Sequence, residues 1–283
     1  MSGEWSLILY TLCIQAAVGI FVASRAVVAG EEEQANRMRF LWIVGGLGVA
    51  GVIASVLHLG NPMNAFRTMS NLATSWLSRE ILFTILFGLT GGLTLVLELK
   101  QIGSRSLRNG VAAVAALVGV GLVFVMSMIY RSFAFPAWAH LSTTASFLAT
   151  TGLIGTAAVF AGQCMRRGED QPKGLSGLVY GALAMLALQM VSVSSHAAYL
   201  GGAGKEAQMT AAMLSGEMAL FFWARVALVV IGSAVVMPWV WRRVGTQNGA
   251  ALAPVAGLLV ALVTLGELLG RFLFYATAVK IGL

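Results

Sequence analysis

Charged residues are scarce in this chain of 283 residues: they make up 10% of it, whereas about a quarter is usual for a soluble domain. Apolar residues make up 58%, and the mean hydropathy is +0.85. Most of the surface therefore does not face water. Because about 20 apolar residues span the hydrocarbon core as one helix, the composition predicts a polytopic protein of the lipid bilayer.

Cysteine, aspartate and histidine are rarer still. Cys13 and Cys164 lie far apart in apolar runs, which indicates neither a disulfide framework nor a metal site. Asp170 is the only aspartate, and the sequence contains no glycine-rich phosphate loop and no nucleophile elbow. These absences exclude nucleotide chemistry and hydrolysis of the kind that soluble enzymes perform.

Long apolar runs predict an all-α fold, a bundle of eight transmembrane helices that forms a single integral membrane domain over residues 1–283. The expected helices lie near 5–29, 38–59, 77–97, 107–130, 138–164, 175–200, 213–241 and 250–278. The first run lacks a basic start and is too long for a signal-peptide core, so we expect it to be retained. Glycines inside the runs, as in "GGLGVAG" (45–51), predict closely packed helices.

The basic residues are distributed unevenly between the two sides of this bundle. The loops after the first, third, fifth and seventh helices, with the adjoining helix ends, hold Arg25, Arg37, Arg39, Lys100, Arg105, Arg108, Arg166, Arg167, Lys173, Arg242 and Arg243. The other side holds Arg67, Arg79, Arg131, Lys205, Arg271 and Lys280. Because basic loops stay in the cytoplasm, both termini are expected to face outward, and the net charge of +7 needs no nucleic-acid partner.

The protein has three histidines, all near the outward ends of their predicted helices. His140 and His196 are at comparable depth, and a b-type haem needs two histidines that face each other. Haem ligands usually lie deeper than this, so we expect no haem and interpret both residues as exposed interfacial histidines.

His58 differs from the other two in its surroundings. It ends an apolar run and is followed by Gly60, Asn61 and Pro62, while Glu80 opens the next run on the same side. Ionisable groups within a membrane are costly and are candidates for function. His58 and Glu80 therefore form either one titratable pocket at the outer membrane edge or an interfacial ion pair.

The segments "IASVLHLGNPMNAF", "SWLSREILF" and "GELLGRFLFY" resemble the membrane-anchor subunit of the dimethyl sulfoxide reductase family. The resemblance implies an anchor in the cytoplasmic membrane that oxidises a quinol such as menaquinol. It also implies an iron–sulfur partner subunit docked on the outer face and a molybdopterin catalytic subunit, which carry the clusters and the molybdopterin.

By the same resemblance, His58 and Glu80 match the two residues tied to the quinol site. Gly60, Asn64, Phe66 and Arg67 are expected around the quinol head group. Asn64 departs from the family pattern, in which arginine often follows Pro-Met, and Arg67 comes three residues later. The chemistry is consistent with this assignment, since a neutral imidazole accepts a hydroquinone proton as a general base and Glu80 orients it or passes the proton on.

Two other functions remain open at this point. A proton-coupled secondary transporter would use His58 and Glu80 as a relay, although such folds usually contain internal repeats and none is visible here. A purely structural anchor would leave both residues without a role.

The last two predicted helices carry two acids and two bases. Glu217 and Arg225 lie in the seventh, and Glu267 and Arg271 in the eighth. The short connector predicts antiparallel neighbours, with Glu217 level with Arg271 and Arg225 level with Glu267. We expect these residues to form structural ion pairs in the interior, because an unpaired charge there would cost about 2.5–3.5 kcal/mol.

Overall fold

The structure is a computed structural model that describes residues 4–27, 34–58, 71–132, 134–165, 174–246 and 249–281. These ranges contain eight helices that are long and apolar enough to cross a membrane, and no β-strand. The expected all-α, eight-helix membrane fold is therefore confirmed. The chain divides into two compact units, Met1–Ile129 and Tyr130–Leu283, and each is described by itself.

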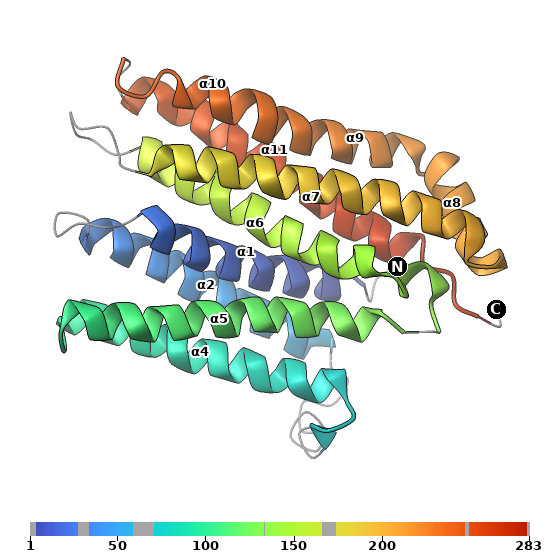
Figure 1. The fold of residues 1–283 in the computed structure, drawn as a ribbon, viewed down its shortest axis with the longest axis horizontal. Coiled ribbons are helices and arrows are strands. Elements are labelled where there is room, and N and C mark those ends of the chain that lie inside the picture. The colour runs from blue at the N-terminus through green and yellow to red at the C-terminus, as the bar shows by residue number, and fades with distance from the viewer. Residues whose placement is uncertain are drawn as a thin grey trace. The chain divides into compact units, whose positions relative to one another are not determined.

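The first unit is built from α1 (Trp5–Val27), α2 (Gln34–His58), α4 (Trp76–Lys100) and most of α5 (Arg105–Tyr130) (Figure 1). α1 packs along α2 and is the most buried of the four helices. Phe21 of α1 meets Phe87 of α4 edge to face, with ring centroids 5.9 Å apart. Gly119 of α5 gives room for this pair, because a Cβ there would come within 2.9 Å of the Phe87 ring.

One end of this unit holds a charge cluster, which consists of Glu98 and three arginines. The Glu98 carboxylate on α4 is 2% exposed and lies 3.6 Å from nitrogens of Arg25, Arg37 and Arg108. These arginines come from α1, α2 and α5, so the cluster connects all four helices of the unit.

Only part of the glycine pattern on α2 packs as expected. A Cβ on Gly51 would lie 3.1 Å from the side chain of Ile14, which fits a close approach of α1. Gly45, Gly46 and Gly48 have no described atom within 4 Å of such a Cβ. Their absent side chains therefore serve no contact within the part of the chain that the structure describes.

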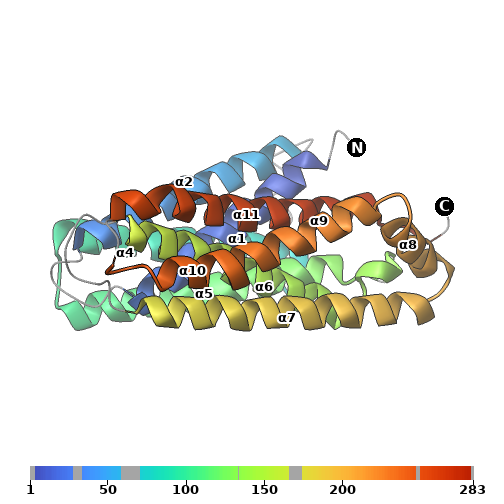
Figure 2. The ribbon, with the colours of Figure 1, turned by 90° about the horizontal axis from the view of Figure 1, so that it is seen from above.

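The second unit is built around α6 (Leu141–Cys164), which is preceded by a 3-10 turn, η2 (Pro136–Trp138). Beside it lie α7 (Leu175–Gly202), α11 (Gly249–Ala276) and a span made of α9 (Ala219–Val230), η3 (Ile231–Val236) and α10 (Met237–Trp241). The short helix α8 (Lys205–Ser215) lies across one end of α7 (Figure 2). Trp138 fastens η2 to α11, since its indole N–H donates to the Phe274 carbonyl at 3.0 Å.

The middle of the α9–α10 span is a π-helix. Its hydrogen bonds skip one residue more than those of an α-helix, as in the bond from the Met237 N–H to the Gly232 carbonyl. Pro238 follows directly and has no N–H to continue the ladder, which accounts for a widened turn at this place.

The seventh predicted helix is shorter than expected. It was placed over 213–241, but α8 ends at Ser215 and α9 begins at Ala219, with a turn between them. Gly216 leaves the helical conformation at φ −102° and ψ −106°, and its N–H closes α8 on the Ala212 carbonyl at 2.8 Å. Glu217 therefore lies in a turn and is exposed, and the expectation that it sits inside the helix was wrong.

Candidate functional site

Glu80 occupies the first turns of α4, and its carboxylate is buried. Ser75 caps this helix by accepting a hydrogen bond from the Ser78 N–H at 3.3 Å. Glu80 follows one turn later and is only 6% exposed, although it lies near the end of the helix. A carboxylate so placed must have partners that replace water.

Tyr10 of α1 is such a partner. Its phenol donates a hydrogen bond to the Glu80 carboxylate, and the ring is itself buried. Tyr10 was not among the residues expected at the site. The only signal for it in the sequence is a polar side chain one and a half turns into the first apolar run, on the side where Glu80 was expected.

His58 is the last residue of α2, as its place before the Gly–Asn–Pro segment predicts. α2 and α4 follow one another along the sequence and contact each other within the first unit. The end of α2 and the start of α4 are thus joined by one connection. The His58 side chain and the expected head-group residues Gly60, Asn64, Phe66 and Arg67 lie outside the described residues.

Arg79 holds the final part of that connection against α4. Its guanidinium donates to the carbonyls of Leu72 and Ala73, at 2.9 and 2.7 Å. The same group lies 4.2 Å above the ring of Trp76. Arg79 therefore fixes how the chain enters α4 just ahead of Glu80.

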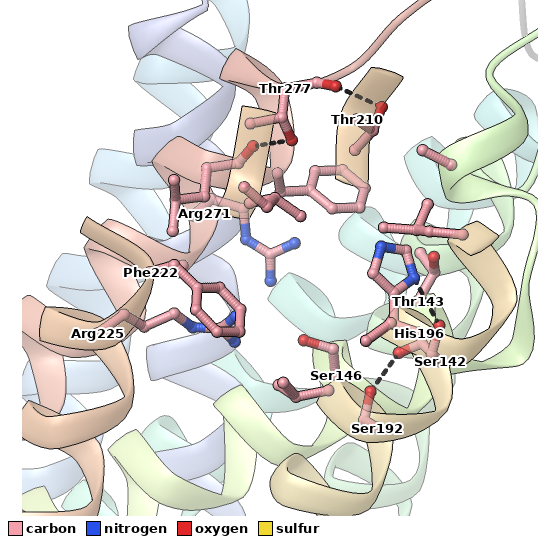
Figure 3. A pocket seen from close by; sticks show the side chains of 18 of the residues that line it. Ser142, Thr143, Ser146, Ser192, His196, Thr210, Phe222, Arg225, Arg271 and Thr277 are labelled. Atoms are coloured by element: carbon pink, nitrogen blue, oxygen red, sulfur yellow. Dashed lines mark hydrogen bonds between the residues drawn. The ribbon is translucent and has the colours of Figure 1, made fainter. Parts of the chain in front are cut away.

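A cavity of about 370 Å³ lies in the second unit (Figure 3). Its walls are mostly apolar and include the rings of Trp138, Phe147, Phe222 and Phe274. Polar side chains enter it from four long helices: Ser142 and Thr150 from α6, Ser192 and His196 from α7, Arg225 from α9, and Glu267 and Arg271 from α11. Nothing in the sequence indicated a cavity, because its lining comes from segments that are far apart along the chain.

Three of the four charged residues expected to pair are part of this cavity. Arg225 and Glu267 are brought together across α9 and α11, with Nη2 and Oε2 4.0 Å apart. The Thr150 hydroxyl donates to the same Oε2 at 2.6 Å. Arg271 is 5% exposed and its guanidinium lies 3.8 Å above the Phe147 ring. Glu217, its expected partner, is not near the interior, because α9 begins two residues after it.

His140 and His196 are half-buried rather than exposed, which corrects the interpretation from the sequence. Both rings hydrogen-bond through one hydroxyl, since Ser142 Oγ lies 2.9 Å from His140 Nδ1 and 3.1 Å from His196 Nδ1. His140 also stacks on Tyr199, with ring centroids 4.5 Å apart. The two histidines therefore act together as part of the packing of α6 and α7.

The protein is similar to known proteins over nearly its whole length. The family model described as DMSO reductase anchor subunit (DmsC) matches residues 1–277. The YnfH subunit of an anaerobic dimethyl sulfoxide reductase of Escherichia coli is 28% identical over 289 residues, which cover 99% of this protein and 96% of that subunit. The DmsC-type subunit of the anaerobic dimethyl sulfoxide reductase of the same organism is 29% identical over 290 residues, with the same coverage. The corresponding subunit of the Haemophilus influenzae enzyme is 29% identical over 161 residues, or 56% of this protein and 58% of that subunit.

Proposed function

Because this chain belongs to the family of DMSO reductase anchor subunits, we propose that it anchors a molybdopterin oxidoreductase complex in the cytoplasmic membrane and oxidises quinol for it. The partners are an iron–sulfur subunit docked on the outer face and a catalytic subunit that holds the molybdopterin. Both termini of the chain lie on the outer, periplasmic side.

The observation that carries this proposal is the buried Glu80 carboxylate with its Tyr10 donor, in the same unit as the histidine that ends α2. A structural anchor has no need of a carboxylate kept from water near the end of a spanning helix. Such a group is costly in a membrane and is retained where it binds or moves protons. The proposed quinol site is formed by His58 and Glu80, with Gly60, Asn64, Phe66 and Arg67 around the head group.

The chemistry requires two acceptors. A quinol that becomes a quinone loses two protons and two electrons. Neutral His58 takes a hydroxyl proton as a general base, and Glu80 orients the imidazole or receives the proton and passes it outward. The electrons pass to an iron–sulfur cluster of the partner subunit, which is the oxidant. The outer edge of the bilayer is where a lipid-soluble quinol, an aqueous proton exit and a docked redox protein meet.

We also propose that this subunit carries no haem. The Ser142 hydroxyl occupies the place between His140 and His196, where a macrocycle would have to lie if both were axial ligands. The purified complex should therefore lack a reduced b-type absorption band that belongs to this subunit, and such a band would refute the assignment.

The proposed function is tested by His58→Arg, which places a fixed cation where a base is needed. We expect loss of quinol oxidation by the purified complex while all subunits remain assembled. Activity with an artificial electron donor that bypasses the anchor should persist. Leu57→Ala is the matched control, since Leu57 precedes His58 and is 76% exposed. Normal quinol turnover in the arginine variant would rule out the proposed site.

A further inference from the structure

We propose that the cavity in the second unit is a second quinol-binding site, which takes the reduced, hydroxyl-bearing ring. It is built from residues other than His58 and Glu80, and its residues are assigned no role by the proposed function. The choice of ligand rests on that function in one respect, namely that the membrane around the protein contains quinol.

Glu267 supplies the first argument. It is 2% exposed and lines the cavity, and its two carboxylate oxygens differ. Oε2 accepts from the Thr150 hydroxyl and faces Arg225, whereas Oε1 is buried without a hydrogen-bond partner among the described residues. A buried acceptor without a donor is costly, so a ligand that occupies the cavity should bring an O–H or N–H to Oε1.

The depth of Glu267 selects the kind of molecule. It precedes the end of α11 at Ala276 by nine residues, about 13 Å along the axis at a rise of about 1.5 Å per residue. A phospholipid phosphate stays near the interface and offers only acceptors to a carboxylate. A flat, neutral ring with hydroxyl groups reaches this depth and fits walls made of Phe147, Phe222 and Phe274.

The cavity has lining residues on the outer surface of the unit through which such a ring would enter. Ala197 of α7, Ser215 of α8 and Trp223 of α9 line the cavity and are exposed, Trp223 at 65%. Figure 3 shows His196, Arg225 and Arg271 directed toward the interior between these helices. A lipid-soluble molecule would therefore pass an apolar rim before it meets the polar groups.

The polar groups also distinguish the two redox forms of the ligand. A quinol has two hydroxyl donors and a quinone has only carbonyl acceptors. Glu267 Oε1, when ionised, accepts from a quinol and repels a carbonyl oxygen. The site should therefore prefer the reduced form, and Glu267→Gln should remove that preference, because an amide both donates and accepts.

The experiment measures binding of a short-tailed naphthoquinol and of its quinone to the purified complex, by calorimetric titration under anaerobic conditions. The intact protein should bind two equivalents of quinol. In Glu267→Gln, which keeps the size of the side chain, one equivalent should bind quinol between roughly tenfold and a hundredfold more weakly, the range for a lost hydrogen bond to a charged group. Affinity for the quinone should not fall.

A pair of variants at the rim provides the control. Ala197→Phe adds a ring to the exposed lining of the cavity and should also remove one equivalent. Ala198→Phe adds the same ring to the next residue, which is exposed and does not line the cavity, and should keep both. A photoreactive naphthoquinol should label peptides from 137–150 or 267–277 in the intact protein, and this labelling should be lost in Ala197→Phe.

The outcomes separate this inference from the proposed function. His58→Arg should remove the other equivalent and leave the one that depends on Glu267. If turnover survives His58→Arg while the Glu267-dependent equivalent remains, the proposed function fails and the second site stands. A single equivalent in the intact protein that is insensitive to Glu267→Gln, or no label in the second unit, would overturn the second site.

Discussion

The smallest scale at which the candidate site can be understood is the pair of Tyr10 and Glu80. The phenol of α1 replaces one of the water contacts that the carboxylate of α4 gives up on burial. Because a hydrogen bond to a charged group is stronger than a neutral one, this contact contributes more than its size suggests. It also fixes the direction in which the carboxylate points, and this is what a residue that orients an imidazole or relays a proton requires.

Tyr10→Phe tests the importance of this contact. The substitution keeps the ring and removes the hydroxyl, so the packing of α1 should persist while Glu80 loses a donor. We expect the specificity constant kcat/KM for quinol to fall by roughly tenfold, with the complex assembled as before. Steady-state kinetics with a soluble quinol give the value.

The control is Tyr180→Phe, which changes an exposed tyrosine of α7 in the other unit and should leave the kinetics unaltered. An unchanged kcat/KM in Tyr10→Phe would show that the hydroxyl has no part in quinol oxidation.

At the scale of helices, the hydropathy of the sequence located the eight membrane spans closely, because a run of about 20 apolar residues has few other stable forms. It did not locate the break before α9. Residues 213–215 and 219–241 form one apolar run in the sequence, and only the backbone of Gly216 and the turn at Glu217 separate them. Consequently the pairing of Arg225 with Glu267 could be predicted from the sequence, whereas the place of Glu217 could not.

The approach of α9 to α11 depends on glycine. A Cβ on Gly266 would lie 2.6 Å from the Val229 side chain and 3.2 Å from the Arg225 carbonyl. Gly266→Val should therefore push the helices apart and destabilise the second unit by about 1–3 kcal/mol, the usual cost of overpacking. Thermal unfolding in detergent, followed by circular dichroism, should show a lower midpoint.

Gly257→Val is the matched control, since it lies on the same helix with nothing described within 4 Å of an added Cβ. Equal unfolding midpoints for the two valine variants would contradict the close contact at Gly266.

On the scale of the whole molecule, the asymmetry of basic residues was visible in the sequence, and so was the number of spans. The cavity of the second unit and the role of Tyr10 were not, since both arise from contacts between segments that are distant in sequence. A pattern along one helix reports which residues are apolar, but it does not report which helix will lie beside it.

The outward orientation of the termini can be tested with two single cysteines. Lys205→Cys lies at the start of α8, and Arg105→Cys at the start of α5, and both positions are exposed. In sealed right-side-out vesicles a membrane-impermeant maleimide should label Lys205→Cys and spare Arg105→Cys, and inside-out vesicles should give the reverse. Labelling of Arg105→Cys in right-side-out vesicles would invert the topology.

The charge cluster around Glu98 has a consequence for the order of events during synthesis. Arg25 and Arg37 leave the ribosome with the first two helices, well before the one carboxylate to which both are joined. Arg108 follows only after Glu98 has appeared. The first helical hairpin is thus left with two arginines at its basic end until the second arrives, and the arrival of α4 is the event that closes the four helices of this unit into one body.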